Sequence, residues 1–122
     1  MPASSFRDPR VWRDAMNLTT NIYRLTSKFP KHELYGLSQQ IRRAAVSVPS
    51  NIAEGKGRYS DRDFVRFLLV ARGSLLELET QLIIAQKLSY LSNEDTDRLP
   101  GMAETVGRAL SGLINSLSQR AA

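Results

Sequence analysis

The chain has 122 residues, 42% of them hydrophobic, and its 17 lysines and arginines exceed its 12 acidic residues, giving a net charge of +5. This length suits one domain spanning residues 1–122, and the absence of cysteine excludes disulfides and thiolate metal sites. No apolar run has signal-peptide length or reaches the roughly 20 residues of a membrane span, so we expect a cytoplasmic protein that has no membrane partner.

The first predicted helix covers about 9–28. Pro9 suits its first position and Asp8 its cap, and Phe29-Pro30 ends it. Its apolar residues fall on one stripe at helical spacing, namely Val11, Ala15, Leu18, Ile22 and Leu25.

The second predicted helix covers about 34–55 and contains Pro49. Its apolar stripe is Leu37, Ile41, Ala44 or Ala45, Val48 and Ile52. Because proline lacks a backbone donor and clashes with the preceding turn, we expect a kink at Pro49. We interpret Ser50 or Asn51 as repairing the hydrogen bonds at the kink; the alternative is that they donate to phosphates. The glycines of the Gly55-Lys56-Gly57 turn end the helix.

The third predicted helix, about 61–90, is the longest. Its main stripe has heptad spacing and predicts bundle packing, through Phe64, Leu68, Ala71, Leu75, Leu78, Leu82 and Ala85. A second stripe contains Leu69, Leu76, Ile83 and Tyr90. A helix that is apolar on two faces must bury both faces against other helices. Either this helix is central in its own subunit, or Leu69, Leu76 and Ile83 form an oligomer interface.

The fourth predicted helix covers about 93–118, and its apolar stripe is Leu99, Ala103, Val106, Leu110, Leu113 and Leu117. Pro100 lies close to its start, so either Asp97 is the true cap or residues 92–99 form a separate turn. Short connections favour antiparallel neighbours. The sequence therefore predicts an all-α fold, an antiparallel up-down-up-down four-helix bundle.

The positive charge is concentrated in the first part of the chain. Residues 1–72 contain 13 of the 17 lysines and arginines and 6 acids, a balance of +7, whereas residues 73–122 have 4 bases and 6 acids, a balance of −2. Such a basic balance favours polyanionic partners, nucleic acid first. Tyr35 and Tyr59 lie near these cations and are candidates to stack on bases, although a core or interface role is the alternative.

Catalytic residues are poorly represented. His32 is the single histidine and has no cysteine or second histidine to complete a site, and Glu77 and Glu79 lie on different sides of a helix. The turn Gly55-Lys56-Gly57-Arg58 lacks the spacing of a nucleotide-binding loop. We expect a protein that is not an enzyme and that needs no metal or cofactor.

Several segments between Phe6 and about Leu91 match the sequence pattern of one protein family, and the longest segment is the most specific part of that match. They are Phe6-Arg7-Asp8, Val11-Trp12, Phe29-Pro30-Lys31, Glu33-Leu34-Tyr35-Gly36-Leu37, the run from Gln40 to Gly55 through Pro49, and Glu77-Leu78-Glu79-Thr80-Gln81-Leu82. The chain resembles the bacterial four-helix bundle family, also called the 23S ribosomal RNA intervening-sequence protein family. The resemblance implies four-helix bundles assembled as homopentameric barrels. Related accessory proteins of diversity-generating retroelements have a basic barrel surface that engages a reverse transcriptase and nucleic acid.

The second apolar stripe of the third helix and the family resemblance together predict a homo-oligomer, expected to be a pentamer. We expect its outward cations to bind RNA or DNA with little sequence specificity, so that the protein acts as a chaperone or scaffold. The alternative is a protein-interaction scaffold whose basic surface docks an acidic partner protein, such as a nucleic-acid enzyme. The candidate nucleic-acid-binding residues are Arg7, Arg10, Arg13, Arg42, Arg43, Lys56, Arg58, Arg62 and Arg66.

Overall fold

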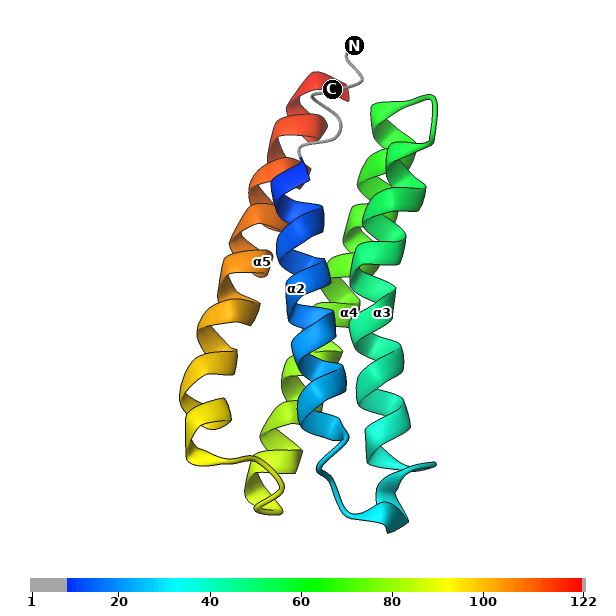
Figure 1. Ribbon diagram of the computed structural model, residues 1–122. Helices are drawn as coiled ribbons and strands as arrows, with labels where there is room; N and C mark the ends of the chain where they lie inside the picture. Colours follow the sequence, from blue (N-terminus) through cyan, green and yellow to red (C-terminus); the bar gives the residue numbers. More distant parts are fainter. Residues whose placement is uncertain (1–8, 122) are drawn as a thin grey trace.

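The computed structural model describes residues 9–121, which form four α-helices and one short 3₁₀ helix (Figure 1). In chain order these elements are α2 (Pro9–Thr26), η1 (Lys31–Glu33), α3 (Leu37–Lys56), α4 (Asp61–Lys87) and α5 (Asn93–Ala121). The described range contains no strand, which confirms the predicted all-α class. None of the described helices is long and apolar enough to cross a bilayer.

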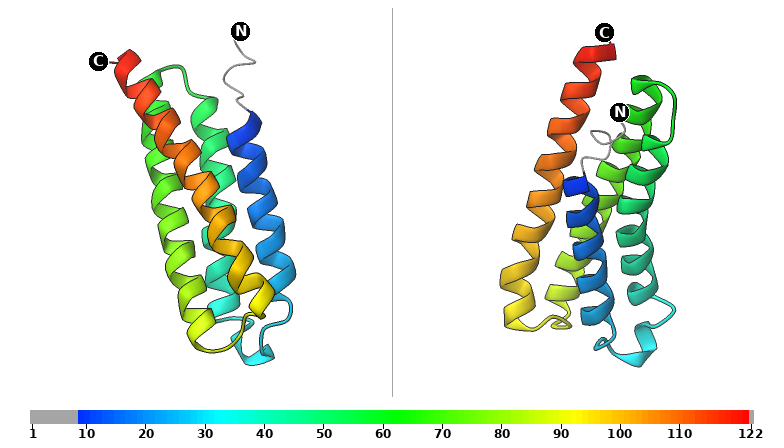
Figure 2. Two further views of the ribbon diagram at one scale, coloured as in Figure 1. Left: turned by 90° about the vertical axis from the view of Figure 1, so that its left-hand side faces the viewer. Right: turned by 45° about the horizontal axis from the view of Figure 1, so that its top comes forward.

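Consecutive helices run in opposite directions along one common axis (Figures 1 and 2). Helix α2 packs on α3, α3 on α4, α4 on α5, and α5 on α2, so the four helices form a closed cycle. Two faces of this cycle are opposite one another, the α2–α3 face and the α4–α5 face. One end of the bundle therefore carries the start of α2, the end of α3, the start of α4 and the end of α5.

The core consists of the stripes that the sequence predicts. Its largest fully buried side chains come from all four helices and are Leu18, Ile22, Ile41, Val48, Leu68, Leu78, Leu99, Val106 and Leu110. In α5 the register differs from the prediction near its end, because Ile114 is buried and Leu113 only half-buried.

Helix α3 continues through Pro49, which is buried. Proline leaves the carbonyl four residues earlier, that of Ala45, without its helical donor. The Thr19 hydroxyl of α2 lies 3.1 Å from this oxygen and 2.8 Å from the Ala15 oxygen. Asn51 donates instead to the Ser47 carbonyl at 2.8 Å. A neighbouring helix therefore supplies the donor that we expected from Ser50 or Asn51, and the kink itself stays a prediction.

Helix α4 ends at Lys87, before the predicted Tyr90. Ser89 has a φ of 64°, the left-handed conformation that ends many helices. Its N–H donates to the Gln86 carbonyl at 2.9 Å, and the Tyr90 N–H donates to the Ala85 carbonyl at 2.9 Å. These two bonds satisfy carbonyls that the helix end leaves free.

Helix α5 begins at Asn93, and the Ser92 hydroxyl accepts a hydrogen bond from the Asp95 N–H at 3.0 Å. Pro100 lies inside this helix, so both sequence-based alternatives were wrong: Asp97 is not the cap, and residues 92–99 are not a separate turn. Pro100 is exposed, and the carbonyl that its missing N–H leaves free is that of Thr96, which is half-buried.

The connection between α2 and α3 is held by Glu33. Its carboxylate accepts hydrogen bonds from the Leu37 N–H at 3.0 Å and from the Tyr90 hydroxyl at 2.9 Å. The bond from Leu37 first, and that from Tyr90 second, lower the pKa of Glu33. The 3₁₀ helix in this connection explains why α3 begins at Leu37 and not near residue 34.

Candidate nucleic-acid interface and neighbouring surfaces

Most of the predicted cations lie at the end of the bundle where α3 passes into α4. The described lysines and arginines within about two turns of this end are Arg10, Arg13, Lys56, Arg58, Arg62, Arg66 and Arg120, and the acids are Asp14, Glu54, Asp61 and Asp63. Seven cations against four acids leave an excess of three positive charges. We call these seven residues the basic end. Arg7 lies outside the described residues.

Three cations of the basic end form ion pairs with its acids. The Arg58–Glu54 pair has a nitrogen–oxygen distance of 3.2 Å, the Arg66–Asp63 pair 3.0 Å, and the Arg120–Asp61 pair 3.1 Å. Each guanidinium in these pairs is solvent-accessible, so the pairs contribute little to stability and are open to competition from a phosphate. Among the described residues, Arg13 and Arg62 have no ion-pair partner.

The turn between α3 and α4 is set by close helix packing. A methyl group at Gly55 would lie 2.7 Å from Cβ of Phe67 and 2.9 Å from Cδ1 of Phe64, so the two helices approach here more closely than any other residue allows. The Arg58 guanidinium lies 4.6 Å from the centre of the Phe67 ring. Tyr59 is fully exposed beside it, which rules out a core role.

Arg42 and Arg43 do not join the basic end, and they face different helices. The Arg42 Nε donates to the Thr26 hydroxyl at 2.7 Å, and the guanidinium lies 4.8 Å from the Tyr23 ring centre, so Arg42 ties α3 to α2. Adjacent helical residues point about 100° apart, and Arg43 lies on the α4 side of α3. Neither pairs with Glu54, whose partner is Arg58.

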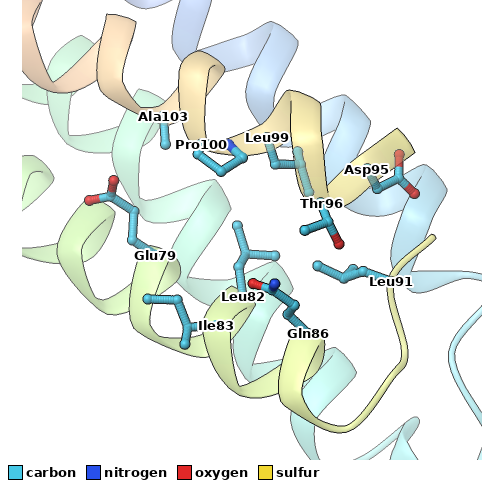
Figure 3. Close-up of a pocket in the computed structure, with 10 residues that line it drawn as sticks. All are labelled: Glu79, Leu82, Ile83, Gln86, Leu91, Asp95, Thr96, Leu99, Pro100 and Ala103. Atoms are coloured by element: carbon cyan, nitrogen blue, oxygen red, sulfur yellow. The ribbon is translucent and has the colours of Figure 1, made fainter. Parts of the chain in front are cut away.

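The second stripe of α4 is exposed in a single copy of the chain. Leu69 is 42% exposed, Leu76 60% and Ile83 53%. Leu76 and Ile83 line a groove between α4 and α5 whose other wall includes Pro100 and Ala103, as Figure 3 shows for the part around Ile83. Helix α4 is therefore not central in its own subunit, and we call this surface the α4–α5 groove.

The α4–α5 groove carries charges of both signs. Glu79 and Glu104 lie in its lining with Arg72 and Arg108, and the Arg108 guanidinium lies 3.9 Å from the Glu104 carboxylate. Burial raises the pKa of Glu79, and the nearby carboxylate of Glu104 raises it further.

An apolar patch on the opposite side of the bundle was missed from the sequence. Trp12, Met16 and Tyr23 of α2 and Val46 of α3 are each between 37% and 44% exposed. Helical spacing places the three α2 residues on one side, next to the predicted core stripe. Their position beside the core stripe was the feature of the sequence that could have predicted this patch. We call these four residues the α2–α3 patch.

A polar cleft of about 450 Å³ opens between α3 and α4. Its lining is Gln40, Arg43, Ala44, Ser47, Ser74 and Glu77. The Ser47 and Ser74 hydroxyls are 2.7 Å apart, so one hydrogen bond joins the two walls. Arg43 and Glu77 belong to different predicted helices, and no sequence pattern indicated that they line one cleft.

The described residues contain no group of three or more histidine, aspartate or glutamate side chains that could bind a metal ion.

Comparison with known proteins places the chain in a family. The model of the 23S rRNA-intervening sequence proteins matches residues 7–112. No curated protein matches the chain significantly. A solved structure of a protein of unknown function from the S23 ribosomal protein family of Bacteroides thetaiotaomicron VPI-5482 is similar, with a TM-score of 0.82 and 22% identity over 89% of this chain and 98% of that one. At this identity the structural likeness supports the fold, and the sequence match defines the family: the chain belongs to the 23S rRNA-intervening sequence proteins.

Proposed function

We propose that this protein is a non-enzymatic homo-oligomer that binds single-stranded or duplex nucleic acid through its basic end, with little sequence specificity, as a chaperone or scaffold. The observation that carries this proposal is the excess of cations over acids where α3 passes into α4. Exposed Tyr59 adds an aromatic ring on which a base can stack. Arg13 and Arg62, which have no ion-pair partner among the described residues, are the first candidates for phosphate contacts.

The two exposed apolar surfaces support the oligomer. A self-complementary dimer needs one surface, whereas this chain has the α2–α3 patch on one side and the α4–α5 groove on the opposite side. Two different surfaces on opposite sides fit head-to-tail contacts, which close into a ring when the rotation allows. The occupant that we infer for the groove is therefore a second copy of this chain.

Five copies, the number that the family resemblance implies, would carry a formal charge of five times +5, or +25. Repeated basic ends on one rigid ring bind a long polyanion through several weak contacts at once, which raises the overall affinity. Every neutralised phosphate also releases counterions, so binding weakens as salt increases.

The test is a titration of fluorescently labelled single-stranded RNA and duplex DNA at several salt concentrations. For three single-strand phosphate contacts per copy, the logarithm of the association constant should fall against the logarithm of salt with a slope of about −2 for each copy that the strand contacts. The variant Arg13→Ala/Arg62→Ala should bind more weakly and with a shallower slope. Arg24→Ala/Lys28→Ala is the matched control, because it removes two exposed cations far from the basic end, one in the last turn of α2 and one in the turn that follows.

Absence of binding at low salt, or binding that does not depend on salt, would refute the proposal. An acidic protein that co-purifies after nuclease treatment, from a chain that binds no nucleic acid, would support the scaffold alternative instead.

A further inference from the structure

The polar cleft between α3 and α4 has opposite charges on its two walls that do not pair with each other. Arg43 comes from α3 and Glu77 from α4, both are exposed, and no ion pair joins them. Ser47 and Ser74 are already bonded to each other, and Asn51 donates to the Ser47 hydroxyl at 3.0 Å. One hydrogen bond uses one of the two serine protons, so free hydrogen-bonding capacity remains on one hydroxyl, on the guanidinium, on the carboxylate and on the Gln40 amide.

A second observation is a buried polar atom without a hydrogen-bond partner on the same face of α4. Gln81 is 7% exposed, and its Oε1 atom has no hydrogen-bond donor among the described residues. Its Nε2 lies 3.5 Å from the Glu77 carboxylate, which is a weak contact. Buried polar atoms normally have partners, and those that do not are candidates for a functional role.

The chemistry of the two walls limits what the cleft can accept. A phosphate or a carboxylate would satisfy Arg43 and be repelled by Glu77, and a simple cation would do the reverse. The ligand must present paired acceptors to one wall and paired donors to the other. A volume of about 450 Å³ lies within the range of small-molecule sites, and the polar lining favours a ligand that forms hydrogen bonds.

We propose that the cleft binds the guanine base of a single-stranded nucleic acid, with Arg43 on the O6 and N7 acceptors and Glu77 on the N1–H and N2–H donors. Arginine binds these guanine acceptors in bidentate fashion, and an unstacked base in a single strand leaves its Watson–Crick donors free for a carboxylate. Adenine places a donor where Arg43 needs an acceptor. Cytosine offers Glu77 one amino group only. Guanine alone gives both walls a paired partner.

The position of the cleft fits this proposal. It lies on the α3–α4 face, which the head-to-tail ring leaves uncovered. Ser74 is eight residues after Arg66 on α4, or about 12 Å along the helix. A strand whose phosphates contact the basic end can therefore reach the cleft within a few nucleotides. This inference rests on the proposed function and adds one base preference to a contact that is otherwise tolerant of sequence.

The test compares the binding of five-nucleotide RNAs that differ only at the centre, UUGUU, UUAUU and UUCUU. The full-length protein should bind UUGUU roughly tenfold more tightly than the other two, within the discrimination of one bidentate contact. Inosine at the centre lacks the N2 amino group, and 7-deazaguanine lacks the N7 acceptor. Each analogue should lose most of the preference.

Two variants test which wall of the cleft makes each contact with guanine. Glu77→Ala should remove the difference between guanine and inosine, and Arg43→Ala the difference between guanine and 7-deazaguanine, whereas the control Arg24→Ala should keep both. Both cleft residues are exposed, and unchanged thermal unfolding would confirm that these variants fold.

Equal, salt-dependent affinities for all RNAs would overturn the cleft proposal and leave the proposed function intact. A guanine preference that both variants retain would overturn it as well. If no RNA binds at low salt, the proposed function falls, and this inference falls with it.

Discussion

Replacing Gly55 with alanine tests whether close contact between α3 and α4 positions the basic end. The added methyl would lie 2.7 Å from Cβ of Phe67 and 2.9 Å from the Phe64 ring. The first of these atoms is next to the backbone and cannot rotate away, so the two helices must separate. Overpacking of this kind costs about 1–3 kcal/mol.

Alanine also has a higher helix propensity than glycine, by about 1 kcal/mol, and this gain must be separated from the clash. Gly112→Ala in α5 is the matched control, because a methyl there meets no atom within 4 Å. If the propensity gains are similar, the two variants differ by the cost of the clash alone. A difference of about 2 kcal/mol corresponds to roughly 8 °C in melting temperature for a chain of this length.

The assay is urea unfolding followed by circular dichroism, at one fixed protein concentration because association changes apparent stability. Gly55→Ala should be the less stable variant and should also bind RNA more weakly, since Phe67 supports Arg58. A Gly55→Ala protein as stable as Gly112→Ala would refute the reasoning.

Four further substitutions or conditions test the remaining contacts. Thr19→Val should lower the free energy of unfolding by about 1–3 kcal/mol, because it removes the donor to a carbonyl that Pro49 leaves free, and Thr19→Ser should restore most of the loss in urea titrations. Ser89→Gly should raise the melting temperature by a few degrees, about 0.5–1 kcal/mol, because glycine adopts a φ of 64° without strain; an unchanged value would contradict this. Gln81→Leu should stabilise the chain by about 1 kcal/mol in the same assay by removing a buried acceptor without a partner, and a loss would show that the amide has one. Hydrogen bonds lower the pKa of Glu33 from 4.5, so its contribution to stability should be complete above about pH 5 and be lost as pH falls through the lowered value. Glu33→Gln should make the urea midpoint depend less on pH in this acid range, and an unchanged pH dependence would contradict the prediction.

Residue periodicity was sufficient to predict the helices and their buried faces, except near the end of α5, where Ile114 and not Leu113 is buried. In α4 the heptad spacing from Phe64 to Ala85 matches the buried side, because a bundle helix buries a fixed angular sector. The same reasoning identified Leu76 and Ile83 as apolar residues outside that sector, and they are exposed.

Contacts between residues far apart in the sequence could not be predicted from sequence patterns. The Thr19 hydroxyl meets a carbonyl 26 residues away, and no local rule links the two positions. Helix α5 continues through Pro100 because tertiary packing of Leu99 and Ala103 outweighs the loss of one backbone hydrogen bond. The cleft between Arg43 and Glu77 likewise exists only once α3 and α4 are placed side by side.

The most direct test of the account is the mass of the assembly by native mass spectrometry and light scattering. The wild-type chain should form a closed oligomer, with five copies of 13.7 kDa giving about 68 kDa. Leu76→Glu/Ile83→Glu, which places charge in the α4–α5 groove, should yield folded single chains, whereas Thr105→Glu on α5, outside the groove lining, should assemble normally. A well-folded wild-type particle of 13.7 kDa at micromolar concentration would contradict the account.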